Sequence, residues 1–173
     1  MPKDKAVHVV VDSTGVKVYG EGEWKVRTHG VGKRRKERKL HLGVDEGSGE
    51  ILGAVVTTND IADCEVLPDI LEQIEQPIEQ GGGDGGYDTK ACYDTISQRG
   101  AKATIPPRSN AKIQQHPHSK LKPHPRNENL RYCNQVGRKQ WKQESGYHRR
   151  SLSETAIFRL KIIFGGKLRR RFA

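Results

Sequence analysis

Hydrophobic runs divide the first third of the chain into short extended segments. A valine-rich run at 7–11 is short enough for a buried strand and ends at Asp12. Residues 12–24 place three glycines between short β-type pieces, a pattern that predicts a turn and a hairpin. Apolar and polar residues alternate over 39–44, and after the turn EGSG the run at 51–58 predicts a second hairpin. The N-terminal part is therefore expected to be β-rich.

Helical and extended patterns alternate in the next segment. Apolar residues at helical spacing predict a crossover helix over 63–76, in which Pro68 requires a start close before it. Residues 78–84 stand where a strand is expected, although three consecutive glycines weaken it. Asp88 can cap a helix that runs to about residue 99, and a short strand then ends at the prolines of IPPR. This alternation predicts an α/β fold with a mixed sheet.

The following segment, 109–146, is polar and contains three prolines and few apolar residues. We expect it to be a long irregular loop, partly disordered, inserted before the last helix of a single domain spanning 1–173. Its histidines at 116, 118 and 124 lack cysteine partners, so a solvated loop is preferred to a metal site.

The clearest helical pattern covers residues 147–164. Leu152, Ala156, Leu160 and Ile163 fall on one stripe at about 100° per residue, which predicts the buried face.

Charge narrows the choice of partner. Lys and Arg total 31 against 21 Asp and Glu, giving a net charge of +10, as is typical of a protein that binds a polyanion. A basic run leads into the alternating segment and favours a DNA-backbone surface over a solvated loop. Its members are Lys25, Arg27, Lys33, Arg34, Arg35, Lys36, Arg38 and Lys39. Only 6% of residues are aromatic, which disfavours an RNA-binding module.

Cysteine and hydropathy patterns restrict the environment of the protein. Three widely separated cysteines suggest neither a disulfide framework nor a Cys-x-x-Cys metal site, and fit a reducing cytosol. No stretch approaches 18 apolar residues, and the N-terminus lacks the hydrophobic region of a signal peptide. Membrane insertion and secretion are therefore disfavoured.

Candidate chemistry lies on the last predicted helix. Tyr147, Arg150, Glu154 and Lys161 would lie within about 60° of one another around its axis. A carboxylate flanked by cations suits a metal ion beside a phosphodiester. The alternative is a capping box starting at Ser151, in which Glu154 only closes the helix start and Tyr147 and Arg150 lie outside the shared face.

Three ordered motifs resemble the catalytic regions of DDE transposases of bacterial insertion sequences. The last helix carries Tyr-x2-Arg-x3-Glu-x6-Lys within YHRRSLSETAIFRLK, similar to the signature around the family's catalytic glutamate. Two earlier regions resemble the first- and second-aspartate regions of the insertion-sequence-five family: VDSTGVKVYGEGEW with RKLHLGVD, and GDGGYDTKACYD with IPPR.

The resemblance implies an RNase H-like fold and metal-dependent DNA strand cleavage and strand transfer. It implies catalytic, metal-binding roles for Asp12, Asp84 and Glu154, with Mg²⁺ as the metal and Mn²⁺ as a substitute. Tyr147, Arg150 and Lys161 would contact DNA near the cleavage site.

The implied partners are double-stranded DNA, as transposon ends and target, and a second copy of the chain. No small-molecule cofactor is expected, and the implied location is the bacterial cytoplasm, at the nucleoid. Three other acids, Asp45, Asp88 and Asp94, are expected to be structural, in a turn, at a helix cap and within a helix.

The ends of the sequence suggest a shortened member of this family. Only eleven residues precede Asp12, where family members carry a DNA-recognition region, and nine follow Phe164. Two hypotheses result: a catalytic transposase domain, or a truncated, non-catalytic remnant that binds DNA non-specifically.

Overall fold

A mixed sheet forms the centre of the molecule in the computed structural model, which describes residues 5–19, 37–114, 122–165 and 167–169. Five strands lie side by side in the order β3-β2-β1-β4-β5, and a short sixth strand, β6, pairs with the far end of β1. The strands are β1 (Val7–Tyr19), β2 (Glu37–Asp45), β3 (Ile51–Thr58), β4 (Ile78–Gly82), β5 (Lys102–Thr104) and β6 (Lys167–Arg169). The pairs β1–β2 and β2–β3 are antiparallel, whereas β4 is parallel to β1 and β5 to β4.

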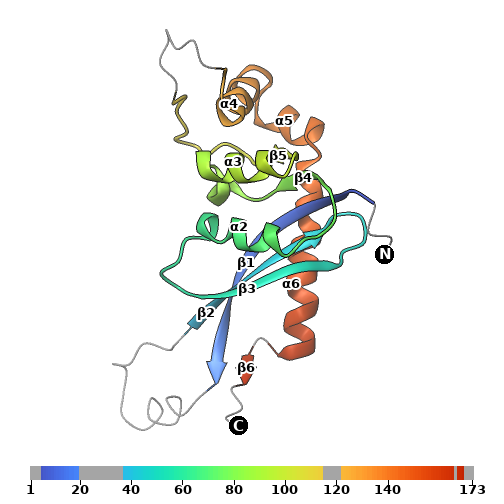
Figure 1. Cartoon of the computed structure of the whole chain (residues 1–173). Coiled ribbons are helices and arrows are strands. Elements are labelled where there is room, and N and C mark those ends of the chain that lie inside the picture. Colours follow the sequence, from blue (N-terminus) through green and yellow to red (C-terminus); the bar gives the residue numbers. More distant parts are fainter. Residues whose placement is uncertain (1–4, 20–36, 115–121, 166, 170–173) are drawn as a thin grey trace.

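Helices cover both faces of this sheet (Figure 1). They are η1 (Asp63–Glu65), α2 (Leu67–Glu72), η2 (Gly85–Tyr87), α3 (Lys90–Gln98), α4 (Pro125–Val136), α5 (Arg138–Glu144), η3 (Tyr147–Arg150) and α6 (Ser151–Phe164). This arrangement confirms the predicted α/β fold, with a mixed sheet flanked by helices as in RNase H-like domains. None of the helices in the described part of the chain is long and apolar enough to cross a membrane.

The alternation of side chains along β1 builds two hydrophobic cores, one on each face. Val9 and Val11 pack in the cluster that contains Ile70 of α2 and Ile96 of α3. On the other face, Val16 packs in the cluster that contains Leu42, Val44 and Ile157 of α6. Since side chains two residues apart share a face, Asp12 lies on the α6 side of the sheet. The sheet therefore directs this carboxylate towards the last helix.

The prediction that β1 ends at Asp12 is wrong. One strand continues from Val7 to Tyr19, so Asp12 lies in its middle and the expected hairpin over 12–24 does not form within the described residues. The antiparallel partner β2 pairs with β1 from Val9 to Lys17, which holds the chain extended through Gly15. Residues 20–24 lie outside the described residues.

Glycines in β4 and directly after it are explained by the helices packed against them. A Cβ atom at Gly81 would lie 3.1 Å from the Ile96 side chain of α3, and one at Gly83 would lie 2.7 Å from the Tyr87 ring. The predicted strand at this position is confirmed, because close helix packing replaces the side chains that glycine lacks. The helix predicted over 63–76 is shorter than expected: α2 begins at Leu67, which places Pro68 in its first turn.

The expected irregular loop at 109–146 is also wrong over much of its length, because α4 and α5 occupy it. Pro125 stands at the start of α4, where proline is tolerated, and His124 caps that helix by accepting from Arg126 N at 3.1 Å. Leu130 and Trp141 are buried. Because Pro125 occupies the first position of α4, it marks the start of a helix. His116 and His118 lie outside the described residues, and His124 Nε2 lies 3.0 Å from Asp94 Oδ1.

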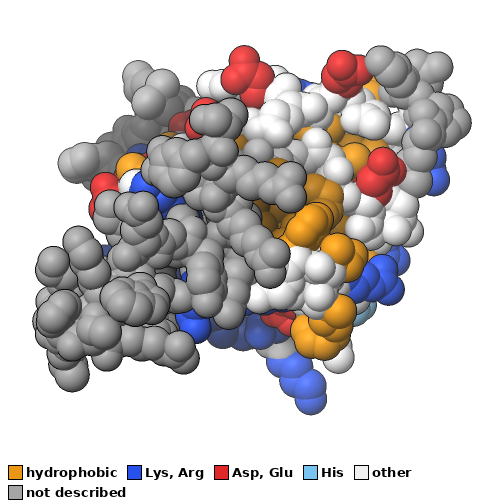
Figure 2. Space-filling model, turned by 90° about the horizontal axis from the view of Figure 1, so that it is seen from below, with side chains coloured by type: hydrophobic (Ala, Val, Ile, Leu, Met, Phe, Trp, Pro, Cys, Tyr) orange, Lys and Arg blue, Asp and Glu red, His pale blue; other side chains and the backbone are white. Residues whose placement is uncertain are grey.

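The buried face of α6 differs from the predicted stripe. Ser153, Ala156 and Ile157 are buried against β1 and β2, whereas Ile163 is 73% exposed. The C-terminal half of the helix thus leaves apolar residues uncovered by other described residues. Figure 2 shows hydrophobic side chains at the surface when the molecule is seen from this end.

Candidate active site

Two of the three candidate acids, Asp12 and Asp84, lie on neighbouring chain segments at the middle of the sheet. The parallel register pairs Val10 of β1 with Gly82 of β4, and Asp12 and Asp84 each come two residues later. Neighbouring strands are about 4.8 Å apart. Asp84 follows the end of β4 as the N-cap residue of η2, where its Oδ1 accepts from Gly86 N at 2.7 Å.

Asp12 has a crowded, partly buried carboxylate. Its Oδ1 accepts from Ser13 N at 2.9 Å, and its Oδ2 lies 3.6 Å from Arg150 Nη2 and 3.5 Å from Ser153 Oγ. Burial raises the pKa of Asp12, and the charges of Asp84 and Glu154 raise it further, against the lowering effects of Ser13 N–H and Arg150. The charges of Asp84 and Glu154 therefore both act on Asp12.

The buried hydroxyl of Tyr87 is affected by two of the same acids. Tyr87 is buried beside the turn that carries Asp84. Burial raises the pKa of Tyr87 strongly, and the charges of Asp63, Asp12 and Asp84 add to the rise. Negative charge is thus concentrated around the middle of β1 and the end of β4, near this tyrosine.

Glu154 approaches from the first turn of α6. Its Oε1 accepts from Arg150 Nη2 at 3.0 Å, and Arg150 Nη1 donates to the Tyr147 hydroxyl at 3.1 Å. Arg150 therefore contacts Asp12, Glu154 and Tyr147, and we call these four residues the carboxylate–arginine cluster. Lys161 lies about two turns beyond Glu154 on α6.

The cluster forms by a route that the sequence did not predict. Tyr147 and Arg150 belong to η3, and α6 begins only at Ser151, so the four signature residues do not share one helix. The capping-box alternative is right that the helix begins at Ser151, but it is wrong about the cap: Arg150 is the N-cap residue of α6, and in the described chain no side chain caps this helix start. The carboxylate of Glu154 instead accepts from Arg150.

The turn that carries Asp84 is fixed by residues that sequence reasoning did not single out. Arg108 donates from Nε to Gly85 O at 2.8 Å and from Nη2 to Gly86 O at 2.7 Å. Asp88 is not the expected helix cap, because Thr89 caps α3 by accepting from Cys92 N. The buried carboxylate of Asp88 instead pairs with Arg126 of α4, with Oδ1 2.7 Å from Nε. Such a contact between distant segments has no signal in a single sequence, although Arg108 ends the IPPR motif.

The family model of the transposase DDE domain matches residues 3–172, almost the whole chain. The chain belongs to this family. Its function is therefore that of a transposase, and DNA is its class of substrate. Members of the family use divalent metal ions in catalysis.

The carboxylates of this transposase domain suit such an ion chemically. Asp12, Asp84 and Glu154 offer the hard oxygen ligands that Mg²⁺ binds. In the described residues, no three His, Cys, Asp or Glu side chains are already grouped as a metal site. The guanidinium of Arg150 contacts both Asp12 and Glu154, so a positive charge stands between two of the three acids.

The predicted basic surface of the transposase domain is only partly described. Arg38 and Lys39 lie in β2, where Lys39 Nζ pairs with Asp63 Oδ1 at 3.1 Å and donates to Ile61 O at 3.0 Å. This lysine is engaged with the η1 segment. The other six residues of the basic run lie outside the described residues: Lys25, Arg27, Lys33, Arg34, Arg35 and Lys36.

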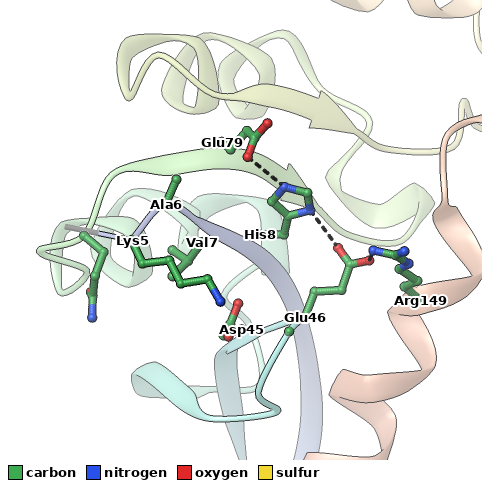
Figure 3. Close-up of a pocket in the computed structure, with 10 residues that line it drawn as sticks. Lys5, Ala6, Val7, His8, Asp45, Glu46, Glu79 and Arg149 are labelled. Atoms are coloured by element: carbon green, nitrogen blue, oxygen red, sulfur yellow. Dashed lines mark hydrogen bonds and ion pairs between the residues drawn. The ribbon is translucent and has the colours of Figure 1, made fainter. Parts of the chain in front are cut away.

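Ion pairs in a cleft that Arg149 of η3 lines hold this segment against the sheet (Figure 3). Arg149 Nη1 lies 3.1 Å from Oε1 of the buried Glu46, which follows β2. His8 of β1 stands between two acids, with Nδ1 3.4 Å from Glu46 Oε2 and Nε2 3.2 Å from Glu79 Oε2 of β4. These contacts tie the segment that carries Arg150 to three strands.

Proposed function

We propose that this domain catalyses DNA strand cleavage and strand transfer during transposition of an insertion sequence of the insertion-sequence-five family. Asp12, Asp84 and Glu154 are its catalytic, metal-holding residues. The observation that supports this assignment best is that Arg150 Nη2 lies 3.6 Å from Asp12 Oδ2 and 3.0 Å from Glu154 Oε1, while the parallel register of β1 and β4 sets Asp84 beside Asp12.

The proposed ligands are the carboxylates of all three acids, with Mg²⁺ as the metal and Mn²⁺ as its substitute. A pair of such ions, when bound, stabilises the charge that develops on the attacking and leaving oxygens of a phosphodiester. Burial around Asp12 strengthens its attraction for cations, because charge is less screened there.

The cations of the cluster serve the DNA. With a metal ion held by Asp12 and Glu154, the Arg150 guanidinium would be free to donate two parallel hydrogen bonds to a phosphate. Tyr147 and Lys161 contact DNA near the cleavage site. Water attacks phosphorus in the cleavage step and the 3′-oxygen leaves. The freed 3′-hydroxyl is the nucleophile in strand transfer, so no covalent enzyme intermediate forms.

The proposed partners follow from the reaction. Double-stranded DNA supplies both the element ends and the target, and two copies of the chain hold the two ends together. The protein acts at the bacterial nucleoid in the cytoplasm and needs no small-molecule cofactor.

Glu154→Gln tests the proposal in a nicking assay with Mg²⁺ or Mn²⁺. The amide keeps size and polarity but lacks the charge that holds the cation, so nicking is lost while DNA binding stays within about twofold. The control is Glu72→Gln, on the exposed end of α2, which leaves nicking unchanged. Full activity in Glu154→Gln would reject the site, and an inactive unmodified chain would reject catalysis by this domain.

A further inference from the structure

We propose that Arg108 is a positioning residue for Asp84, and that the buried Asp88–Arg126 pair fixes the segment from which Arg108 acts. The inference rests on the proposed role of Asp84 as a metal ligand. It gives the α4 segment a part in the active site, although α4 itself carries none of the three acids.

The turn after Asp84 has little to hold it in place by itself. It is a single 3-10 turn whose first two residues are Gly85 and Gly86, and glycine restricts the backbone least of all residues. Gly86 N donates to Asp84 Oδ1 at 2.7 Å, so the position of this amide determines where one carboxylate oxygen lies.

Arg108 binds both glycine carbonyls of that turn. Its Nε donates to Gly85 O and its Nη2 to Gly86 O, at 2.8 and 2.7 Å. A guanidinium is planar, with donors in a fixed fork, so binding two successive carbonyls sets their relative orientation. Because Gly86 carries the amide that contacts Asp84, this double contact acts directly on the proposed metal ligand.

The backbone of Arg108 is itself fixed. Its N–H donates to Asp88 Oδ2 at 2.9 Å, and the two oxygens of Asp88 contact Nε and Nη2 of Arg126 at 2.7 and 3.1 Å. Asp88 is 4% exposed and Arg126 6%. Arg126 also donates from Nη1 to Lys112 O at 3.2 Å. The η2 turn, the chain after β5 and α4 are thereby joined by charged hydrogen bonds.

Removal of Arg108 separates positioning from folding, because this side chain lies on the surface whereas Asp88 and Arg126 are buried. Loss of either buried partner would leave an unpaired charge and threaten the fold. Arg108→Ala and Arg108→Lys are therefore the informative variants. Lysine carries the charge but cannot reproduce the fork.

The matched control is Arg99→Ala. Arg99 also binds backbone carbonyls with its guanidinium, from Nη1 to Leu71 O at 2.9 Å and from Nη2 to Ile74 O at 2.6 Å, but it acts at the end of α2. The two alanine variants thus remove the same kind of contact from different places.

The measurements are Mn²⁺ affinity of the full chain, from the free-ion signal in electron paramagnetic resonance, and hydrogen exchange of the Gly86 amide by nuclear magnetic resonance. Arg108→Ala weakens Mn²⁺ binding by roughly 10–100-fold, as is usual for residues that orient metal ligands, and speeds exchange at Gly86. The Mn²⁺ affinity and the Gly86 exchange rate of Arg108→Lys lie between those of Arg108→Ala and those of the unmodified protein. Arg99→Ala lowers Tm but leaves both readouts unchanged.

Equal Mn²⁺ affinity and equal Gly86 exchange in Arg108→Ala and the unmodified protein would overturn the inference and leave the proposed function standing. The reverse case is also distinct: an unmodified chain that binds Mn²⁺ but never nicks DNA fails the proposed function only. If the unmodified chain binds no Mn²⁺, faster Gly86 exchange in Arg108→Ala alone supports the positioning role, and unchanged exchange overturns it.

Discussion

At the scale of a single residue, the proposed role of Asp12 in metal binding needs a negative charge that its burial disfavours. It stands in the middle of a strand that is buried on both faces, and only 15% of its side chain is exposed. Burial disfavours its charged form, and two further acids act in the same direction. The charged form of Asp12 therefore lowers the stability of the fold, and the same surroundings strengthen its attraction for cations.

Asp12→Asn therefore stabilises the fold at neutral pH in the absence of divalent metal. We expect the free energy of unfolding at pH 7 to rise by about 0.5–2 kcal/mol. The pKa of Asp12 is raised in the folded state, so the penalty is absent below the ordinary value near 3.8 and grows as the pH rises through the folded value. Urea denaturation from pH 3.5 to 7 measures it.

The control for this prediction is Asp94→Asn, on the exposed surface of α3, which changes stability by less than about 0.5 kcal/mol at any pH. A stability gain in Asp12→Asn that does not shrink towards low pH would contradict the prediction, because desolvation of the charge would then not be its origin.

Motifs, more than local physical patterns, pointed to the three candidate acids. Asp84 follows a glycine-rich strand and has no periodicity to distinguish it from Asp88. What could not be foreseen is Arg126, which reaches Asp88 across 38 positions. A buried ion pair depends on how α4 docks, and docking is decided by tertiary contacts rather than by nearby residues.

At the scale of elements, the close approach of η2 to the sheet determines which glycines matter. Gly83→Ala would place Cβ 2.7 Å from the Tyr87 ring and 3.1 Å from Val11. We expect a loss of about 1–3 kcal/mol from overpacking, measured by thermal and urea denaturation.

Gly15→Ala is the matched control, because Gly15 lies in β1 with no atom within 4 Å of an added Cβ. Alanine there leaves stability unchanged or raises it slightly, since it restricts the unfolded chain. Equal effects of the two substitutions would show that glycine flexibility, and not packing, decides both.

Elements with a strong hydrophobic alternation were predictable, and those held by polar contacts were not. The β2–β3 hairpin is confirmed. The strand β4 is confirmed as well, although its glycines weaken the pattern and only its place in the order of elements indicated it. The α4–α5 pair was hidden because its contacts are largely polar, as in Asn129, which donates to Ile105 O and accepts from Trp141 Nε1. On α6, the buried face includes Ser153, a polar residue that faces Asp12 and that no apolar stripe would select.

At the scale of the whole molecule, the net charge of +10 predicts salt-dependent DNA binding with little sequence preference. Four clustered charges are candidates for phosphate contacts. Replacing them by glutamine should lower the slope of log affinity against log salt by up to about 3–4, measured by fluorescence anisotropy. The residues are Lys33, Arg34, Arg35 and Lys36.

A second variant separates location from total charge, with glutamine at four exposed lysines elsewhere. They are Lys90, Lys102, Lys112 and Lys139. We expect a smaller change in slope for this variant. Equal slopes in the two variants would show that the basic run makes no particular contact with DNA.

The position of β1 at the centre of the sheet has a consequence for the order of folding. During synthesis β1 leaves the ribosome before the other strands of the sheet, and its neighbour β2 soon follows. Its parallel partner β4 comes about sixty residues later, and the pairing of Lys17 with Lys167 waits until α6 has been made. Contacts so distant in sequence form slowly, and an unpaired strand edge can pair with other chains. The strand that holds Asp12 is therefore begun early and completed among the last, which makes the nascent chain most dependent on protection from aggregation while its central strand is half-paired.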